Sequence, residues 1–404
     1  MNHTKMTSTE RRAVTSLSSI MGLRMMGLFM VLPVFSVYAA ELKGATPALI
    51  GLALGIYGLS QALFQIPFGT LSDRFGRKPL ILIGLILFIA GSLTAGFADS
   101  MTTMIIGRSL QGVGAIGSTI MAYVADHTRE NQRTKAMAIA GITIGCSFSL
   151  AMFVGPILVQ WLTVNGLFFL AAFLGFICIG VLYLTPSCSH HRWQRESEPE
   201  LRSFMRLLIS PELAKLNIGI FTLHAIFTAS FIIIPIGLQQ FAGLETSQQW
   251  QIYLPALLAA FILALFCIGM AERKQQIKIY FIGGIAALVL AEIVLWSAKS
   301  NILLISSGIC LFFAGFSLLE AFLPSLVSRT APPSRKGSAL GIYSSAQFLG
   351  IFVGGVLGGW LYGQFSFNGV YLFCITLSLI WLALATFMQP VFFFKGEKEY
   401  CESS

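Results

Sequence analysis

The sequence predicts an all-α membrane protein with twelve transmembrane helices in two pseudo-symmetric six-helix bundles. Two observations predict this fold. First, 56% of the 404 residues are hydrophobic and only 11% are charged, with a mean hydropathy of +0.79, whereas roughly 25% charged residues are usual in a soluble domain. Second, the lysine and arginine residues alternate between the predicted loops as expected for a polytopic membrane protein.

Each predicted span is close to the roughly 20 residues with which a helix crosses about 30 Å of hydrocarbon. The first apolar run follows Lys5, Arg11 and Arg12 but is interrupted by Arg24 and is too long for a secretory signal core, so we expect an uncleaved first helix. In chain order the spans cover residues 16–39, 49–68, 79–98, 102–124, 136–160, 166–184, 216–238, 250–271, 278–298, 301–327, 337–361 and 369–388.

Basic residues support this order independently of hydropathy. With both termini in the cytoplasm, 22 of the 26 lysine and arginine residues fall in cytoplasmic segments. Only Lys43 and Lys299 lie outside, and Arg24 and Arg108 lie within spans. The net charge of +9 therefore reflects membrane orientation and indicates no nucleic-acid partner. The seven cysteines form no CxxC pair, so we expect neither a disulfide framework nor a metal site.

The predicted organisation is an N-terminal bundle (1–186), a cytoplasmic linker (187–215), a C-terminal bundle (216–390) and a cytoplasmic tail (391–404). Within the linker, residues 201–208 have the pattern of an interfacial amphipathic helix, and His190-His191 is read as part of a solvated segment rather than a metal site. A weak internal repeat supports two related halves around a central cavity. In it, Glu272, Arg273 and Lys274 after span eight resemble Asp73, Arg74 and Lys78 after span two.

Four motifs resemble those of the major facilitator superfamily. The stretch GTLSDRFGRK (69–78), which we expect to be a short, tightly turned loop, resembles the signature between helices two and three. RSLQGVG (108–114) resembles the RxxQGxG motif of helix four, and Gly155-Pro156 the antiporter motif of helix five. MVLPV (30–34) is similar to the helix-one signature of the twelve-helix drug:proton antiporters. Further similarity to the YajR-type branch, a bacterial inner-membrane group, lies in residues 23–24, 29–34, 133–138 and 347–350.

Two departures accompany the resemblance. The YajR-type proteins carry a soluble C-terminal domain, whereas this chain ends shortly after its last predicted span, so we expect that domain to be absent. The antiporter motif is incomplete, with Ala151 where a glycine is common and residues 158–160 where a glycine pair would follow. The resemblance implies a monomeric inner-membrane transporter that exports small lipophilic or cationic compounds, uses the proton gradient, and needs no cofactor.

The loop motif has a physical interpretation as a conformational latch. Gly69 and Gly76 permit a tight turn and close helix approach. Asp73 is expected to face the positive N-terminal end of span eleven, near Gly337, in the opposite bundle. Arg74, Arg77, Lys78 and Asp126 would complete a charge network that holds the outward-facing state. The alternative is that these residues only mark topology and cap helices.

Ionisable residues within spans are functional candidates because their burial is costly. Glu320 is our leading proton carrier, since hydrocarbon favours the neutral acid. His224 is the second candidate, with packing an equal alternative. Arg108 would hold a negative partner or bind backbone carbonyls, and Arg24 would face the cavity or a nearby charge. We interpret Glu292, in span nine, as a packing or snorkelling residue.

The sequence indicates the transported compound only weakly. We expect an apolar, adaptable cavity, and a metabolite or siderophore transporter of either direction remains an alternative. A transporter-like receptor or scaffold would not need buried titratable groups. An enzyme is disfavoured because the sequence has no Ser/His/Asp set, metal cluster or GxxxxGK[ST] loop. The candidate cavity residues are Met30, Tyr57, Gln61, Gln65, Met121, Gln347 and Phe348.

Overall fold

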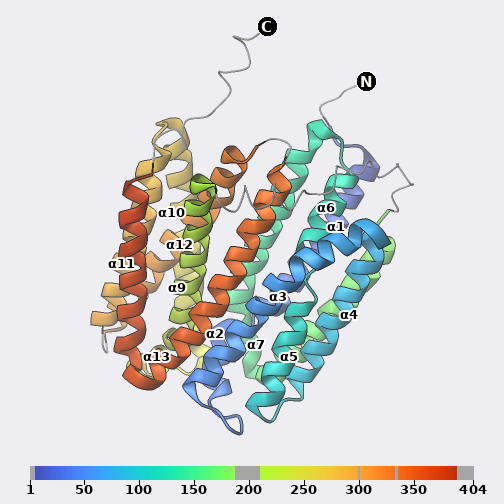
Figure 1. The fold of residues 1–404 in the computed structure, drawn as a ribbon. Coiled ribbons are helices and arrows are strands. Elements are labelled where there is room, and N and C mark those ends of the chain that lie inside the picture. The colour runs from blue at the N-terminus through green and yellow to red at the C-terminus, as the bar shows by residue number, and fades with distance from the viewer. Residues whose placement is uncertain (1–4, 187–209, 299–300, 333–334, 389–404) are drawn as a thin grey trace.

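The computed structural model describes residues 5–186, 210–298, 301–332 and 335–388. This part of the chain is helical, without any strand beyond a single bridge between Lys43 and Ser100. The beginning of the first helix and the end of the last lie at the same end of the molecule, the upper one in Figure 1. We call this the terminal end, and the opposite one the far end. The predicted amphipathic segment 201–208, His190-His191 and the tail lie outside the described residues.

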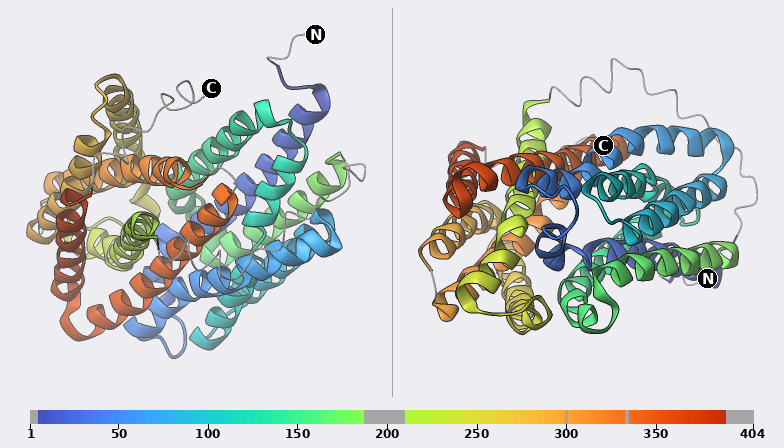
Figure 2. Two further views of the ribbon diagram at one scale, coloured as in Figure 1. Left: turned by 45° about the horizontal axis from the view of Figure 1, so that its top comes forward. Right: turned by 90° about the horizontal axis from the view of Figure 1, so that it is seen from below.

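The N-terminal half winds back and forth between these two ends (Figures 1 and 2). Its last helix, α7, starts beside Arg129 and finishes beside Lys78, which donates a hydrogen bond to Thr185 O at 2.7 Å. Both positions are at the terminal end, so α7 must double back, and it does so at Thr163, where φ is 58°. The helices are α1 (Ser8–Phe29), α2 (Leu32–Ala39), α3 (Pro47–Phe75), α4 (Arg77–Gly96), α5 (Met101–Val113), α6 (Gly117–Asp126) and α7 (Glu130–Leu184).

The C-terminal half follows the same plan. Lys278, in the first turn of α11, donates to the carbonyl oxygens of Thr386 at 2.9 Å and Met388 at 2.6 Å. Lys278 is thus the counterpart of Lys78, and the predicted pairing of Lys274 with Lys78 was wrong. The last helix reverses at Ser366, where φ is 55°. The helices are α9 (Pro211–Ala242), the short η1 (Thr246–Gln248), α10 (Trp250–Arg273), α11 (Ile277–Ser297), α12 (Ile302–Thr330) and α13 (Lys336–Thr386).

Nine helical segments of the described residues are long and apolar enough to cross a membrane. At about 1.5 Å per residue, the 55 residues of α7 and the 51 of α13 are too long for one crossing. Their reversals follow the predicted boundaries between spans five and six and between spans eleven and twelve. The number of twelve crossings remains a prediction.

Two predicted spans are interrupted. Span one loses its regular hydrogen bonding between α1 and α2, where Met30 and Val31 keep helical backbone angles but Pro33, in the first turn of α2, has no backbone N–H to donate. Span four breaks after Val113, because the backbone of Gly114 leaves the helical region at φ −67° and ψ 50°. Discontinuous helices in a membrane leave backbone polar groups that other groups must satisfy. At the interruption in span four, the buried side chain of Arg24 donates to the carbonyl oxygen of Gly114.

The first helix is fixed to the loop before α7 at the terminal end. Thr7 and Glu10 form a capping box at the start of α1. The Glu10 carboxylate also accepts hydrogen bonds from Arg129, from Nε at 2.9 Å and from Nη2 at 3.0 Å. This hydrogen-bonded carboxylate raises the pKa of Arg129, so the guanidinium stays charged. The Thr-x-x-Glu spacing is the sequence signal for this cap.

The two halves meet most closely through glycines of α3 and α13. A Cβ built on Gly51 would lie 2.1 Å from Gly355 O, and one on Gly359 would lie 2.4 Å from Pro47 O. Gly354 and Gly358 belong to the other face of α13 and instead approach Ala225 and Ala229 of α9. The glycine-rich helix is therefore clamped between its own half and the opposite one, as small residues permit in membranes.

These contacts lie toward the far end, and the halves part toward the terminal end. Gln160 Nε2 of α7 donates to Ser247 O of η1 at 2.9 Å, which joins the halves at the far end. Near the terminal end, a Cβ on Gly141 of α7, on Gly269 of α10 or on Gly337 of α13 would meet no heavy atom within 4 Å. The conformation is closed at the far end and open at the terminal end.

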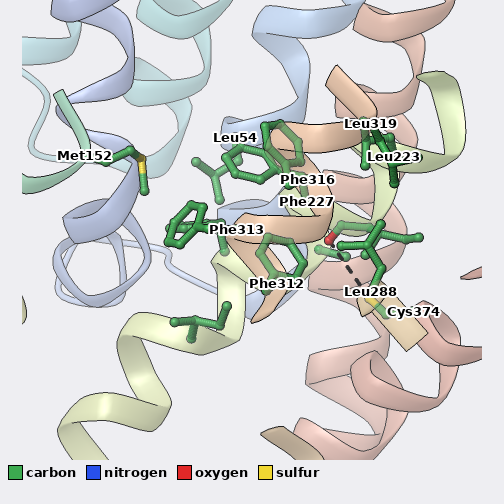
Figure 3. Packing of buried hydrophobic residues seen from close by; sticks show 14 of the residues in the cluster. Leu54, Met152, Leu223, Phe227, Leu288, Phe312, Phe313, Phe316, Leu319 and Cys374 are labelled. Carbon is green, nitrogen blue, oxygen red and sulfur yellow. Dashed lines mark hydrogen bonds between the residues drawn. The ribbon is translucent and has the colours of Figure 1, made fainter. Parts of the chain in front are cut away.

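The hydrophobic core crosses the boundary between the halves. Figure 3 shows Phe227, Phe312, Phe313 and Phe316 of the C-terminal half close together, with Leu54 and Met152 of the N-terminal half beside them. Phe227 and Phe316 have ring centroids 4.7 Å apart. The same aromatic group adjoins the ionisable residues described next.

Candidate functional site

The GTLSDRFGRK stretch is more helical than predicted. Helix α3 continues to Phe75 and α4 begins at Arg77, so Gly76 alone makes the turn. Its φ of 94° is a conformation that L-residues rarely adopt. Gly69 lies within α3, where an added Cβ would meet only Ser118 Oγ at 3.6 Å, an ordinary contact. The prediction that Gly69 is needed for a tight turn or close approach was therefore wrong.

This difference gives a testable pair of variants. We expect Gly76→Ala to destabilise the protein by about 1 kcal/mol or more, because alanine is strained at this φ. We expect Gly69→Ala to be neutral or slightly stabilising, since alanine is the better helix former. Thermal unfolding of the two variants in detergent measures the difference. Equal unfolding temperatures for the two would contradict the assignment of the turn to Gly76.

Arg77 is the centre of the charged cluster at the motif. Its side chain is only 10% exposed and forms an ion pair with Asp73. Arg77 Nε lies 3.0 Å from Asp126 Oδ2, and Nη1 donates to Ser72 Oγ at 2.6 Å. The predicted network of Asp73, Arg77 and Asp126 is thus present within the N-terminal half. Arg74 stays outside it, with its guanidinium 5.5 Å from the ring centroid of Phe75.

The predicted contact between Asp73 and the start of span eleven is absent from this conformation. The Asp73 side chain is 58% exposed, and the neighbourhood of Gly337 is open. This agrees with the parting of the halves at the terminal end. Asp73 cannot contact the start of α13 while the terminal end is open. The latch therefore remains a prediction for the state in which this end is closed.

Glu320, His224 and Gln347 come together from three helices of the C-terminal half. His224 Nε2 of α9 lies 3.9 Å from Glu320 Oε2 of α12. Gln347 Nε2 of α13 lies 2.9 Å from His224 Nε2 and 3.4 Å from Glu320 Oε1. Glu320 Oε2 is shielded from solvent and has no hydrogen-bond partner. Two separately predicted proton-coupling candidates are therefore neighbours, joined by a predicted cavity residue.

The hydrogen bonds indicate a tautomer for His224. His224 Nδ1 lies 3.3 Å from the carbonyl oxygen of Ile220, which can only accept, so the ring proton is placed on Nδ1. Nε2 then accepts from the Gln347 amide, which also donates to Glu320. With the Gln347 amide oriented so that its Nε2 faces the ring, the imidazole is assigned as neutral. A proton added to Nε2 would face a second donor, and Gln347 would have to rotate its amide.

Aromatic rings surround this cluster and connect it to the N-terminal half. The His224 ring lies 5.6 Å from that of Phe316. Phe148 of α7 stacks at 5.9 Å on Phe316, and Phe29 of α1 meets Phe148 at 4.9 Å. These phenylalanines carry no local signal in the sequence, because phenylalanine is spread along the whole chain.

Arg24 satisfies the carbonyl oxygen of Gly114, where the fourth span is interrupted. It is 1% exposed, and its Nη2 donates to Gly114 O at 2.8 Å and to Gln61 Oε1 at 3.1 Å. Gly114 caps the C-terminal end of α5, where a positive charge is stabilised by the helix dipole. The guanidinium also lies 5.4 Å from the ring centroid of Phe88. Arg24 therefore faces neither an open cavity nor a carboxylate among the described residues.

Arg108 is held in a comparable way. Its Nη1 donates to Gln111 Oε1 at 2.8 Å and its Nε to Ala53 O at 3.3 Å. Its guanidinium lies 5.5 Å from the ring centroid of Tyr57, and Tyr57 contacts Phe348 of the other half at 6.3 Å. Arg108 thus binds one backbone carbonyl and one side-chain amide oxygen, and it forms no ion pair with a carboxylate among the described residues.

The predicted cavity residues divide into two groups. Met30, Tyr57, Gln61 and Gln65 are buried in the packing of the N-terminal half, whereas Met121, Gln347 and Phe348 are partly exposed.

The helix-five motif packs against the break in helix one. A Cβ on Gly155 would lie 1.9 Å from Met30 O, so only glycine fits there. Pro156 lies within α7. The two residues that resemble the antiporter motif are thus at a helix contact within the N-terminal half.

Glu292 is more deeply buried than a snorkelling residue would be. It is 0% exposed and accepts a hydrogen bond from Ser230 Oγ at 2.7 Å. Snorkelling is therefore wrong for this side chain.

Comparisons with known proteins agree with this architecture. The sequence profile of the Major Facilitator Superfamily matches residues 17–355 and also 278–399. The chain is 46% identical over 390 residues to the inner membrane transport protein YajR of Escherichia coli, covering 96% of this chain and 86% of that protein. It is 25% identical to the multidrug resistance protein MdtH of Aeromonas salmonicida, covering 85% and 86%.

Solved structures show the same fold at low sequence identity. A point mutant of the nucleoside transporter NupG superposes with a TM-score of 0.75 at 13% identity, covering 93% of this chain and 99% of that one. The relatives and structural neighbours are transporters rather than enzymes. The membrane-length helices, the two similar halves and the profile match together show that this chain belongs to the Major Facilitator Superfamily of membrane transporters.

Proposed function

We propose that this protein is a proton-coupled secondary transporter that exports small lipophilic or cationic compounds by alternating access. The observation that carries the proposal is the cluster of Glu320, His224 and Gln347. A carboxyl group with an unpartnered oxygen beside a neutral imidazole can bind a proton and release it. The Glu320 side chain as a whole is 38% exposed, although Oε2 itself is shielded, so water or substrate can reach the rest of the side chain.

The surroundings of Glu320 favour a lipophilic cation as substrate. Phe316 lies one helical turn before Glu320, and Phe148 and Phe227 extend the aromatic surface across the two halves. Aromatic faces and a carboxylate both attract cations. Competition between a proton and a cationic substrate for one carboxylate is a direct way to couple their movements. The printed name of the relative MdtH, a multidrug resistance protein, supports the same class.

The conformation supports alternating access. With the predicted topology the terminal end is cytoplasmic, so the far-end contacts make this an inward-facing state. In the outward-facing state the terminal end would close and Asp73 would reach the start of α13. Protonation of the cluster would shift the balance between the two states only if the proton binds more tightly to the cluster in one state than in the other.

The experiment uses proteoliposomes with an imposed pH gradient and tetraphenylphosphonium as the probe. We expect the native protein to accumulate the probe against its gradient in exchange for protons. We expect Glu320→Gln to lower this accumulation on the order of tenfold, within the usual range of coupling energies, while exchange of probe down its own gradient continues. Gln cannot bind the proton but keeps the size of the side chain.

The matched control is Glu212→Gln, which changes an exposed carboxylate in the first turn of α9. It should transport as the native protein does. Full proton-driven accumulation by Glu320→Gln would refute Glu320 as the carrier. If the native protein never accumulates the probe, the export of cations is wrong, and counterflow of neutral and anionic metabolites tests the alternative of a metabolite or siderophore transporter.

A further inference from the structure

The C-terminal half contains a second buried carboxyl group, Glu292, which the proposed transport cycle does not use. Ser230 Oγ donates to its Oε1 at 2.7 Å. Oε2 is inaccessible to solvent and has no hydrogen-bond partner. No described lysine, arginine or histidine forms an ion pair or hydrogen bond with it. A carboxylate with one bare oxygen and no counter-charge is costly in hydrocarbon, and a proton on Oε2 removes that charge.

The other groups that face Glu292 are neutral. From α9 there is Ser230, whose Oγ also lies 3.6 Å from Cys374 Sγ of α13. Tyr371 lies one turn before Cys374 on α13. Helix α12 packs against α11 on both sides of Glu292 through apolar residues. Gly315 lies against Leu288, one turn before Glu292, and Gly308 lies against Leu295, one turn after it. Helix α10 makes few contacts with α11.

A cavity of about 250 Å³ begins one helical turn from this site. Its wall includes Leu295 and Trp296 on α11, Ile234 on α9 and Tyr371 on α13. Leu295 and Trp296 follow Glu292 by three and four residues, Ile234 follows Ser230 by four, and Tyr371 precedes Cys374 by three. On each of these helices, the cavity residue is the one nearer the far end. Asn368, which accepts a 2.8 Å hydrogen bond from Trp296 Nε1, completes the wall on that side.

Glu292 is distinct from the Glu320 cluster. Ser230 lies six residues beyond His224, about 9 Å along α9 at 1.5 Å per residue, in the direction of the far end. The Glu320 cluster lies nearer the terminal end, whereas the cavity next to Glu292 lies on the far-end side of that carboxyl group, within the C-terminal half. The two carboxyl groups are therefore placed to exchange with opposite sides of the membrane.

We propose that Glu292 is a second proton-binding site, which exchanges its proton with the far-end side of the membrane through this cavity. The step is a simple protonation: a hydronium ion gives its proton to Oε2, a water molecule remains, and the bond from Ser230 to Oε1 is kept. Tyr371, on the cavity wall one helical turn from Cys374, stands at the inner end of the path.

Infrared spectroscopy of the purified protein tests the site without any substrate, so its outcome is independent of the proposed transport function. The difference between native protein and Glu292→Gln should contain the carbonyl band of a protonated carboxylic acid. This band should shift when H₂O is replaced by D₂O, because the acid proton exchanges. The Gln variant is a suitable reference, since its amide oxygen still accepts the hydrogen bond from Ser230.

The route is tested by filling the cavity. In Ile234→Phe the larger side chain should occupy space next to Ser230 and slow the deuterium shift severalfold. Leu258→Phe adds the same ring to an exposed apolar surface of α10, where Leu258 is 56% exposed. It should leave the rate of the deuterium shift unchanged. Unfolding temperatures confirm that both variants are folded.

Three outcomes would overturn the proposal. If the acid band is missing at every pH at which the protein is folded, Glu292 is never protonated. If the band is present but does not shift in D₂O, Glu292 is a sealed structural acid. If Ile234→Phe exchanges as fast as the native protein, the proton does not use the cavity.

Discussion

Gly355→Leu is expected to open the far end and shift the protein toward the opposite conformation. A Cβ at this position would lie 2.5 Å from Gly51 O and 2.8 Å from Gly55 Cα, both in the other half. A leucine therefore wedges the halves apart, at a cost of about 1–3 kcal/mol for the closed far end. The opposite conformation does not incur this free-energy cost, because its far end is already open. The population ratio should change by roughly 5- to 150-fold.

Distances between spin labels measure this shift. In a background without native cysteines, labels at Lys43→Cys and Glu245→Cys report on the far end, because these exposed residues flank it from the two halves. Gly355→Leu should lengthen the distance. Gly341→Leu is the matched control on the same helix, because nothing lies within 4 Å of that position. An unchanged distance in Gly355→Leu would show that the glycine contacts do not hold this end closed.

Arg24→Ala is expected to cause the largest loss of stability, about 3–5 kcal/mol. The change removes a fully buried large side chain and leaves a cavity. It also takes away the donor to Gly114 O at the end of α5 and to Gln61 Oε1. A buried polar group left without its partner costs about 1–3 kcal/mol. The two halves of span four should then separate more easily.

Denaturant unfolding in detergent micelles compares Arg24→Ala with Arg11→Ala. Arg11 is an exposed arginine of the same helix, and its replacement should change the free energy of unfolding by no more than about 0.5 kcal/mol. Arg24→Lys should fall between the two, since lysine keeps the charge at the helix end but lacks the fork of donors. A native-like stability for Arg24→Ala would mean that water replaces the guanidinium.

The sequence predicted the order of the membrane helices well, because hydrophobic length and the placement of lysine and arginine are local properties. It located the reversals of α7 and α13 within a few residues of Thr163 and Ser366. It missed the breaks in spans one and four, since Met30-Val31 and Gly114–Ile116 lie inside long apolar runs. A run of apolar residues shows that a segment is buried in lipid or protein, but not whether its hydrogen bonds are continuous.

The charged motif shows a second limit. Its residues were found correctly, and Arg77 does join Asp73 to Asp126. The ends of the loop were not predicted correctly, because Gly69 and Gly76 are both glycines and nothing in the sequence tells which of them makes the turn. Only the backbone shows that one is helical and the other has a φ of 94°. Glycine is compatible with both conformations, so its presence cannot distinguish them.

By itself, the sequence determined that this is a membrane transporter of two related halves, and which ionisable residues are buried. Tertiary structure decided which of those residues meet. Glu320 and His224 are almost a hundred positions apart and become neighbours through Gln347, while Glu292 is isolated beside Ser230 and Arg24 caps a broken helix. The physical reason is that burial is set by local hydrophobicity, whereas partnership depends on the rotation, depth and breaks of helices that pack from distant parts of the chain.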